Sequence, residues 1–424
     1  MWGGKFGERV LKIQRRKLNL KINLIFAENF LNKFIKMKII NISFVIIILL
    51  MLGCGGNKQT NDDFITIDVT ASYPKKELIL QDFMDVEYIP LETRGEFYCQ
   101  GVVEAVGKDV IIVKNRIRDG NIFIFDRNGK GLRKFNHMGR GPEEYLSIRG
   151  IVLDEDNGEM FINSSQKIIV YDLFGKFKRS FNHKKEANYN RICNYDRNNL
   201  ICHDGSYRIS FELENIQAFF IVSKQDGSVT KKIEIPFEYR KTQNIWSSDM
   251  STSTTPGEPQ QILLYRNNLI LFEISSDTLF RYLPDHSIES FLARSPSIQT
   301  MNPEVFLFPG MLTDHYYFME ALTKEYNFNT GEGFPRKYLM YDRRAKAIFE
   351  YMVYNDDFSG KWSVNMTGQS LNIKNYEIAS CHKLEADDLF EAYKKGQLKE
   401  KLKDIAAELK EEDNPVLMMI KYKK

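Results

Sequence analysis

Two stretches of the chain repeat one another, and they decide the fold. Residues 122–137 have the sequence IFIFDRNGKGLRKFNH, and residues 168–183 have the sequence IIVYDLFGKFKRSFNH. They align without a gap: an apolar run, an Asp, a Gly-Lys pair and a closing Phe-Asn-His. An Asp side chain accepts backbone N–H groups in a tight turn, and Gly supplies the positive φ that such a turn needs. Each stretch is therefore predicted to form a β-hairpin.

Weaker copies of this hairpin follow at residues 220–233, 279–291 and 338–351. The corresponding positions lie 46, 52, 59 and 59 residues apart, about one four-stranded blade each; they are Phe125, Tyr171, Ser223, Tyr282 and Tyr341. Short strands at regular spacing indicate an all-β fold. We predict a six-bladed β-propeller over residues 64–424. Each hairpin would be the outer pair of a blade, and the chain ends would supply the sixth blade.

The ends of this region carry the strands that would close the ring. The N-terminal candidates are residues 64–69, 77–80 and 86–91, and the C-terminal candidate is residues 415–421, PVLMMIK. Terminal strands that share one blade hold the last blade interface together. Between them, apolar residues recur at helical spacing over residues 385–412, which predicts one helix packed outside the last blade. A helix that binds a partner is the alternative.

An export signal precedes the predicted propeller. The apolar run of residues 39–52 is too short to span a bilayer, has a basic flank and ends at the small residue Gly53. Cys54 follows directly and offers a thiol for lipid attachment. We interpret residues 37–53 as a lipoprotein signal peptide and residues 54–63 as a tether. Residues 1–36 are an extension ahead of Met37, which is the more natural start. A short membrane anchor is the alternative interpretation.

Processing at Cys54 changes the charge of the protein. The whole chain has 59 basic and 56 acidic residues, a net charge of +3. Residues 1–53 hold ten basic and two acidic residues, so the remainder has a net charge of −5. Nucleic-acid binding needs a clustered basic surface, and nothing in the sequence predicts one.

Four further cysteines are too few to form a disulfide scaffold. Cys193 and Cys202 flank the turn at residues 196–199 and can face each other across a hairpin. An exported protein can form such a bond, but a direct cross-strand disulfide is often strained. We expect buried free thiols at both positions.

Other motifs accompany the hairpins in a specific order. Residues 88–93 read YIPLET, residues 138–145 read MGRGPEEY, and residues 413–417 read DNPVL. With the export signal and the hairpins, they resemble the NHL-like six-bladed β-propeller lipoproteins of Bacteroidetes over nearly all of residues 64–424. The resemblance implies a lipid-anchored protein of the cell envelope, periplasmic or on the surface of the outer membrane. It also implies a frequent association with glycan use, and no established activity.

The loop at residues 139–145 is the most distinctive candidate site. Two glycines and a proline restrict its backbone path. Arg140, Glu143 and Glu144 can face the channel and bind a polar ligand. Alternatively the loop only connects two blades, with a glutamate pairing Arg140, and we favour that role. Trp246, in the long Ser- and Thr-rich stretch 241–260, is a further candidate contact residue because such loops often carry function.

The sequence assigns no catalytic residue, no metal site and no cofactor. The acidic run at residues 154–159, DEDNGE, lacks the spacing of an EF-type calcium loop and fits a hairpin turn. His137 and His183 occupy the same repeat position, which favours a structural role. None of the common nucleophile, zinc or phosphate-binding motifs appears.

These observations favour a non-catalytic binding or accessory module tethered to the envelope, whose partner is a glycan, a peptide or an envelope protein. A propeller hydrolase or lyase is the first alternative, because its residues would come from several blades and escape local motifs. A structural subunit of an envelope complex is the second.

The predicted processing can be measured directly. We expect mass spectrometry to find a mature chain that begins at a lipid-modified Cys54. In Cys54→Ser the precursor should stay unlipidated, because serine lacks the thiol that receives the lipid. A mature chain beginning at any other residue contradicts the lipoprotein interpretation.

Overall fold

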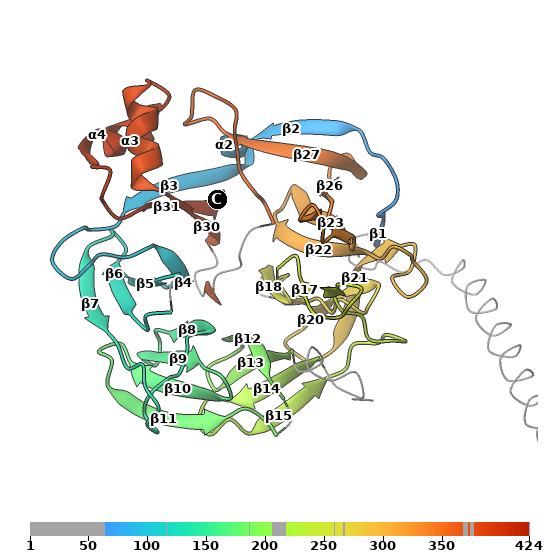
Figure 1. Ribbon diagram of the computed structural model, residues 1–424, viewed down its shortest axis with the longest axis horizontal. Coiled ribbons are helices and arrows are strands. Elements are labelled where there is room, and N and C mark those ends of the chain that lie inside the picture. The colour runs from blue at the N-terminus through green and yellow to red at the C-terminus, as the bar shows by residue number, and fades with distance from the viewer. Residues whose placement is uncertain are drawn as a thin grey trace, which may run out of the picture. The chain divides into compact units, whose positions relative to one another are not determined.

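The structure, a computed structural model, describes residues 64–423 except 117, 186, 206–217, 258, 266–267, 368–371 and 374–376. The predicted signal peptide, Cys54 and the tether lie outside the described residues. Residues 64–424 form one compact unit, in which six sheets are arranged as blades around a centre (Figure 1). The prediction of a six-bladed β-propeller is confirmed. Within the described part of the chain, no helix is long and apolar enough to cross a membrane.

In each of the first three blades, four antiparallel strands follow one another outward in chain order. In blade 1 the short strand β29 (Asn372–Ile373) adds in parallel to the inner edge. Blade 1 consists of β4 (Val102–Val106), β5 (Val110–Lys114), β6 (Ile122–Asp126) and β7 (Gly131–Phe135). Blade 2 consists of β8 (Gly150–Asp154), β9 (Glu159–Asn163), β10 (Lys167–Asp172) and β11 (Phe177–Asn182). Blade 3 consists of β12 (Tyr189–Asn194), β13 (Asn199–Asp204), β14 (Phe219–Ser223) and β15 (Val229–Ile233). The two repeated hairpins are β6–β7 and β10–β11, the outer pairs of blades 1 and 2, as predicted.

The last three blades combine strands from both ends of the chain. Blade 4 consists of β18 (Ile262–Tyr265), β19 (Asn268–Leu271), β20 (Thr278–Tyr282) and β21 (Ile288–Ser295), with β1 (Ile65–Asp68). Blade 5 consists of β22 (Val305–Leu312), β23 (Tyr316–Thr323), β26 (Arg336–Asp342) and β27 (Ala347–Asn355), with β2 (Lys75–Ile79). Blade 6 consists of β30 (Ile378–Leu384) and β31 (Val416–Tyr422), with β3 (Met84–Pro90).

Short elements decorate these blades. They are the helical turn α2 (Leu80–Phe83), the hairpins β16 (Ile245–Trp246) with β17 (Ser253–Thr254) and β24 (Tyr326–Asn327) with β25 (Glu332–Gly333), β28 (Trp362–Ser363) beside β27, and β29 (Asn372–Ile373), parallel to β4.

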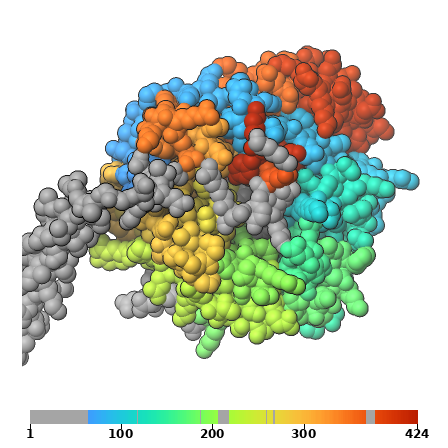
Figure 2. All heavy atoms as spheres, turned by 180° about the vertical axis from the view of Figure 1, so that it is seen from behind, coloured from blue at the N-terminus to red at the C-terminus, as the bar shows by residue number. Residues whose placement is uncertain are grey.

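The N-terminal strands spread over three blades. β1 and β2 add in parallel to the outer edges of blades 4 and 5, and only β3 pairs with β31 in the last blade. All three lie at the outer edges of their sheets. Figure 1 shows β2 on the rim of the ring and β3 beside β31, and in Figure 2 this blue segment lies against the orange and red C-terminal part. The closing pair β3–β31 agrees with the sequence prediction, whereas the parallel placement of β1 and β2 was not predicted.

The hairpin turns follow the predicted chemistry. The Asp126 carboxylate accepts the backbone N–H groups of Asn128 and Lys130 at 2.8 and 2.9 Å. Asp172 makes the same two contacts one blade later, also at 2.8 and 2.9 Å. Gly129 and Gly175 both have a φ of +83°. In the weaker copy of blade 4, His286 stands at the glycine position and keeps the positive φ, at +69°. In blade 5, Ala345 stands at that position and the positive φ, +49°, falls one residue later, on Lys346.

The repeated residues also join neighbouring blades. A Cβ atom on Gly175 would lie 3.0 Å from the Phe135 ring of the preceding blade. The His137 ring stacks on Tyr171 at 5.0 Å, and its Nε2 lies 2.8 Å from the Gly175 carbonyl oxygen. Phe135 and His137, which close the first hairpin, therefore pack against the turn of the second hairpin. The repeat is an interface between blades as well as a turn.

The predicted helix 385–412 is divided into two. α3 (Ala386–Lys394) and α4 (Glu400–Glu408) are separated by Gly396, whose φ is +66°. Gly396 N–H donates to the Tyr393 carbonyl and Gln397 N–H to the Ala392 carbonyl, both at 2.9 Å. This left-handed glycine cap ends α3. Leu389 and Leu402 pack with β3 and β31 in one core cluster, so the pair lies against the last blade as predicted.

Cys193 and Cys202 are free thiols. Cys193 pairs with Ile201 across the strands and Cys202 pairs with Ile192, so the two side chains point to opposite faces of the sheet. Burial raises the pKa of both thiols. A disulfide between them is excluded by this register, which agrees with the expectation of buried free thiols.

Gly129 allows a direct test of the contact between the first and last blades. A Cβ at Gly129 would lie 2.0 Å from the Pro90 carbonyl oxygen of β3, whereas Gly158, at φ +62°, has no neighbour within 4 Å. Gly158→Ala should cost about 1 kcal/mol, the penalty for a left-handed backbone. Gly129→Ala should cost about 2 kcal/mol more, because the added methyl overlaps a backbone atom. Urea unfolding measures both, and equal losses would contradict the close approach.

Candidate functional site

A cavity of about 740 Å³ lies inside the ring. All six blades contribute to its wall. The lining residues are Gly101, Val102, Val103, Glu104, Lys114, Arg116, Arg149, Arg191, Pro256, Gly257, Pro259, Gln260, Gln261, Phe308, Pro309, Glu320, Arg336, Thr367, Cys381, His382 and Lys383. Ligand sites in proteins have volumes of about 300–1,000 Å³, so this cavity has the size of a binding site.

The cavity opens at the end of the ring where the chain passes between blades. Gly101 directly precedes β4, Arg149 directly precedes β8, and residues 256–261 lead into β18. Because strands alternate in direction within a blade, the turns between the two outer strands lie at the opposite end. Blade-to-blade connections therefore shape the cavity, and the repeated Asp-x-x-Gly turns do not.

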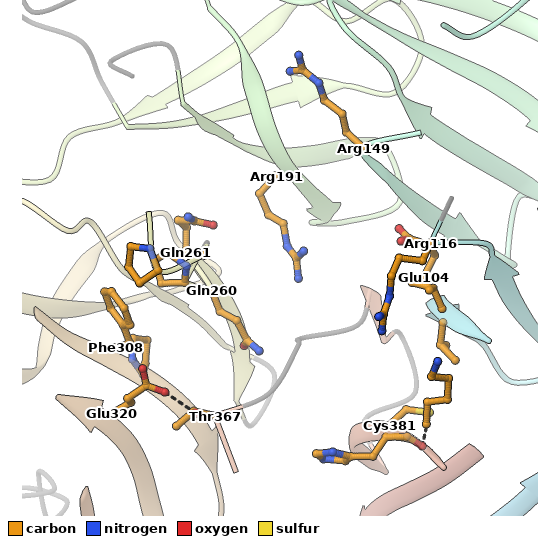
Figure 3. Close-up of a pocket in the computed structure, with 18 of the residues that line it drawn as sticks. Glu104, Arg116, Arg149, Arg191, Gln260, Gln261, Phe308, Glu320, Thr367 and Cys381 are labelled. Carbon is orange, nitrogen blue, oxygen red and sulfur yellow. Dashed lines mark hydrogen bonds between the residues drawn. The ribbon is translucent and has the colours of Figure 1, made fainter. Parts of the chain in front are cut away.

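Among the described lining residues, basic side chains outnumber acidic ones. Six of the described lining residues are Lys or Arg and two are Glu. Figure 3 shows the side chains of Arg116, Arg191 and Gln260 pointing into one space, with Arg149 farther from its centre in this view. His382 also lines the cavity, but burial lowers its pKa to about 4, so its ring is neutral at pH 7.

Both lining carboxylates are held in ion pairs. Glu104 contacts Lys114 Nζ at 2.9 Å and accepts the Ile151 backbone N–H at 3.1 Å. Glu320 pairs with Arg336 and accepts the Thr367 hydroxyl at 3.1 Å (Figure 3). These contacts fix two sides of the wall.

Arg149 is also held in position. Its guanidinium donates to the Asn188 side-chain oxygen, and the Asn188 backbone N–H donates to Asp204 at 2.9 Å. Asp204 is buried at the end of β13. The guanidinium is thus positioned by a chain of hydrogen bonds from blade 3.

One lining residue, His382, belongs to a His–Ser pair of a type used in catalysis. His382 Nε2 lies 3.3 Å from Ser380 Oγ, but Ser380 is 6% exposed and is not a lining residue. Cys381 lines the cavity, and burial raises the pKa of its thiol to about 12. Nucleophilic cysteines need a lowered pKa, so this thiol is not activated. No group of three His, Cys, Asp or Glu side chains that could hold a metal ion occurs among the residues described.

The predicted residues of the 139–145 loop lie outside the cavity lining. Arg140 and Glu143 are exposed. Glu144 accepts the backbone N–H of Gly141 at 2.7 Å, within its own loop. Lys167 Nζ donates to the Gly141 and Pro142 carbonyls at 3.3 and 3.0 Å, which fastens the loop to blade 2. Arg149, four residues after the end of this loop, does line the cavity.

Trp246 is 45% exposed on the β16–β17 hairpin, where it pairs with Ser253. It is not among the lining residues, but residues 256–261, which follow the same hairpin, are. The structure therefore places Trp246 at the same end of the ring as the cavity without bringing it into the wall.

The other singled-out residues have structural partners. In the acidic run, Asp154 pairs with Lys224 at 2.6 Å and Glu159 pairs with Arg179 at 2.7 Å. His183 Nε2 lies 2.9 Å from the Asn163 side-chain oxygen, and its Nδ1 accepts the Tyr189 backbone N–H at 3.3 Å. Both patterns agree with the structural roles favoured from sequence.

Sequence reasoning missed the arginines that line the cavity. Arg116, Arg149 and Arg191 belong to three different blades, on or next to inner strands that the hairpin alignment does not include. The available signal was a basic residue close to the inner strand of successive blades. This recurrence of basic residues can be recognised only when the alignment of the repeats includes the inner strands as well as the hairpins.

These features define a six-bladed β-propeller with a polar cavity inside its ring. The chain belongs to the family described as a domain of unknown function (DUF4934), which matches residues 64–421. None of the curated proteins matches the chain.

The chain is similar to solved structures. An assigned exported protein from Bacteroides fragilis NCTC 9343 has a TM-score of 0.59 at 12% identity, over 85% of this chain and 100% of that one. A protein of unknown function from Bacteroides caccae has a TM-score of 0.31 at 9% identity, over 64% and 85% of the two chains. Virginiamycin B lyase from Staphylococcus aureus has a TM-score of 0.32 at 12% identity, over 63% and 88%.

Buried neutral histidines predict loss of stability in acid. Burial lowers the pKa of both His183 and His382 to about 4. Below pH 6.5 the unfolded chain binds protons that the folded chain does not, so stability falls from about pH 6.5 toward pH 4. Urea unfolding should show a loss of about 3 kcal/mol between pH 7 and 5. His183→Gln should reduce this difference by about half, and an unchanged free energy of unfolding across the range contradicts the assignment.

Proposed function

We propose that this protein is an envelope-tethered, non-catalytic binding module that takes its ligand in the cavity inside the propeller. The observation that carries the proposal is the cavity of about 740 Å³, with a wall built from all six blades. Its polar groups converge from separate strands, which is the usual arrangement of a small-molecule or oligosaccharide site.

The chemistry of the wall favours binding over catalysis. Glu104 and Glu320 are each held by a basic side chain, the Cys381 thiol is protonated, and Ser380 is buried behind the wall. An acid–base mechanism needs a titratable group poised near the working pH and within reach of the substrate. The two carboxylates are engaged in ion pairs, the Cys381 thiol is protonated and the Ser380 hydroxyl lies outside the wall, so none of the four groups is placed to transfer a proton to or from a substrate.

Sequence features support the envelope location. The export signal and Cys54 precede the propeller, and the chain resembles the NHL-like lipoproteins of Bacteroidetes. The similar Bacteroides fragilis protein is itself assigned as exported. On this proposal a lipid on Cys54 anchors the protein to the membrane, and the short polar tether at residues 54–63 links the lipid to the propeller.

Glycans are the ligand class that this location and resemblance favour. Trp246 is an exposed aromatic residue at the same end of the ring as the cavity, and aromatic rings stack on sugar rings. In this role Trp246 contacts the part of a glycan that projects from the cavity. Arg140, Glu143 and Glu144 would add polar contacts at the same end.

A substitution that fills the cavity with a larger side chain tests the proposal. We expect the full-length protein to bind a subset of neutral or acidic oligosaccharides on a glycan array, with affinity confirmed by calorimetry. Gln260→Trp should abolish this binding, because the larger ring occupies the cavity. The control is Gln225→Trp, an exposed position in the β14–β15 turn at the opposite end of blade 3. Absence of binding, or equal loss in both variants, contradicts a site inside the ring.

A further inference from the structure

We propose that three side chains at the junction of blades 3 and 4 form a binding site for ferric iron. They are Tyr195, directly after β12, Tyr282, the last residue of β20, and His286, in the β20–β21 turn. Turns between strands of one blade lie at the end of the ring opposite the blade-to-blade connections, and so opposite the cavity. The inference therefore concerns a second site and goes beyond the proposed binding function.

Three polar atoms of these side chains face one another. His286 Nδ1 lies 2.8 Å from the Tyr282 hydroxyl oxygen and 3.2 Å from that of Tyr195, which comes from the neighbouring blade. The two hydroxyls are also within hydrogen-bonding reach of each other. In octahedral coordination with bonds of about 2.1 Å, neighbouring ligand atoms lie about 3.0 Å apart. The three atoms thus already have the spacing of three ligands on one face of a metal ion.

The corresponding junction between blades 2 and 3 joins the same two turns through an ion pair. Asp154, at the end of β8, contacts Lys224 in the β14–β15 turn at 2.6 Å, and Lys224 also donates to the Asp196 carbonyl at 2.8 Å. The junction of blades 3 and 4 instead brings together two phenols and an imidazole. All three groups are possible ligands of iron, so this junction has a chemistry that its neighbour lacks.

The backbone of His286 gives a second reason to assign it a role besides the turn. Its φ of +69° lies in the left-handed region, where blades 1 and 2 have glycine. This conformation is disfavoured for a residue with a Cβ atom, and such outliers gather at functional sites. A turn alone would favour glycine. The imidazole is therefore retained in spite of the backbone that carries it.

The site is open to solvent and has carboxylates beside it. His286 is exposed and Tyr195 is half-buried, so an ion can reach the three polar atoms. Asp285 precedes His286, and Asp196 follows Tyr195. Burial, and then the charges of Asp196 and Asp285, raise the pKa of the Tyr195 phenol. The two carboxylates are thus close enough to attract a cation to the site.

Ferric iron fits this set of ligands better than a divalent ion. Burial raises the pKa of Tyr195 and of Tyr282, so both phenols are protonated at pH 7. An ion that binds both oxygens must displace both protons, which a trivalent, strongly Lewis-acidic cation does most readily. Tyrosine oxygen is a ligand of ferric haem iron, and imidazole also suits iron. Binding would release the two phenol protons to solvent and leave the other coordination positions to water or a carboxylate.

A titration of the full-length protein with ferric nitrilotriacetate tests the site. We expect about one iron to bind per chain, with release of about two protons. A visible phenolate-to-iron charge-transfer band should accompany binding, because only an iron bound to tyrosine oxygen produces it. Calorimetry in buffers of different ionisation enthalpy measures the proton release.

Substitutions assign the band to this cluster. Tyr195→Phe and Tyr282→Phe each remove one oxygen and keep the ring, and each should weaken iron binding by more than about 100-fold. Tyr239→Phe removes the hydroxyl of an exposed tyrosine at the other end of the ring and should change nothing. His286→Gly should also lose iron affinity. Its urea midpoint without iron should not fall, because glycine adopts the positive φ freely.

Each other result overturns the inference. Absence of the band means that no tyrosine oxygen binds iron. A band of full strength in both Phe variants places the iron elsewhere. Retained affinity in His286→Gly shows that the imidazole serves only the turn, and tighter binding of cupric or zinc ion makes the choice of metal wrong. A blank glycan array bears on the cavity alone and leaves this test independent.

Discussion

The ring depends on the pairing of β3 with β31. Seven residues of β3 pair in antiparallel register with β31, from Met84 opposite Tyr422 to Pro90 opposite Val416. This ladder joins parts of the chain more than 300 residues apart, and residues 416–420 are fully buried. A propeller without such a closing pair leaves two blade faces open to water. The inner strands keep their places around the cavity because this outer pair closes the circle.

Contacts between neighbouring blades also hold the ring together. Phe135 and His137 close the first hairpin and pack against Gly175 and Tyr171 of the second. Residues that look like parts of a turn are therefore also parts of an interface. In blade 4, His286 adopts the positive φ at the glycine position, whereas in blade 5 the positive φ falls on Lys346, one residue after that position. The left-handed turn therefore persists in blade 4 although the glycine that reveals it in the sequence is lost.

This distinction explains what the sequence could predict. The Asp-x-x-Gly hairpins, the closing strands and the lack of long helical periods are local patterns, and they predicted a propeller. The count of six blades rested partly on the family resemblance, because the later hairpins are degenerate. The break at Gly396 was missed because one glycine in a Lys- and Glu-rich segment does not interrupt the apolar period. The parallel addition of β1 and β2 was missed because strand partners in parallel are not encoded in spacing.

The candidate site was not predicted from the sequence for a different reason. The Gly-rich loop at 139–145 is conspicuous in sequence because its backbone is constrained, and its hydrogen bonds to Lys167 serve that backbone. Arg116, Arg149 and Arg191 are inconspicuous because each is a single basic residue in an ordinary strand or connection. They acquire meaning only when the β3–β31 pair closes the ring and gathers them in one wall.

If the proposed function is correct, closure of the ring and binding of a ligand in the cavity are thermodynamically coupled. A ligand that contacts several blades binds the closed ring and not an opened one, so it stabilises the closing pair by mass action. Conversely, any change that loosens the β3–β31 ladder separates the arginines and weakens the site without touching it. In a propeller of this kind the residues that hold a ligand and those that hold the fold are far apart, yet they act on the same equilibrium.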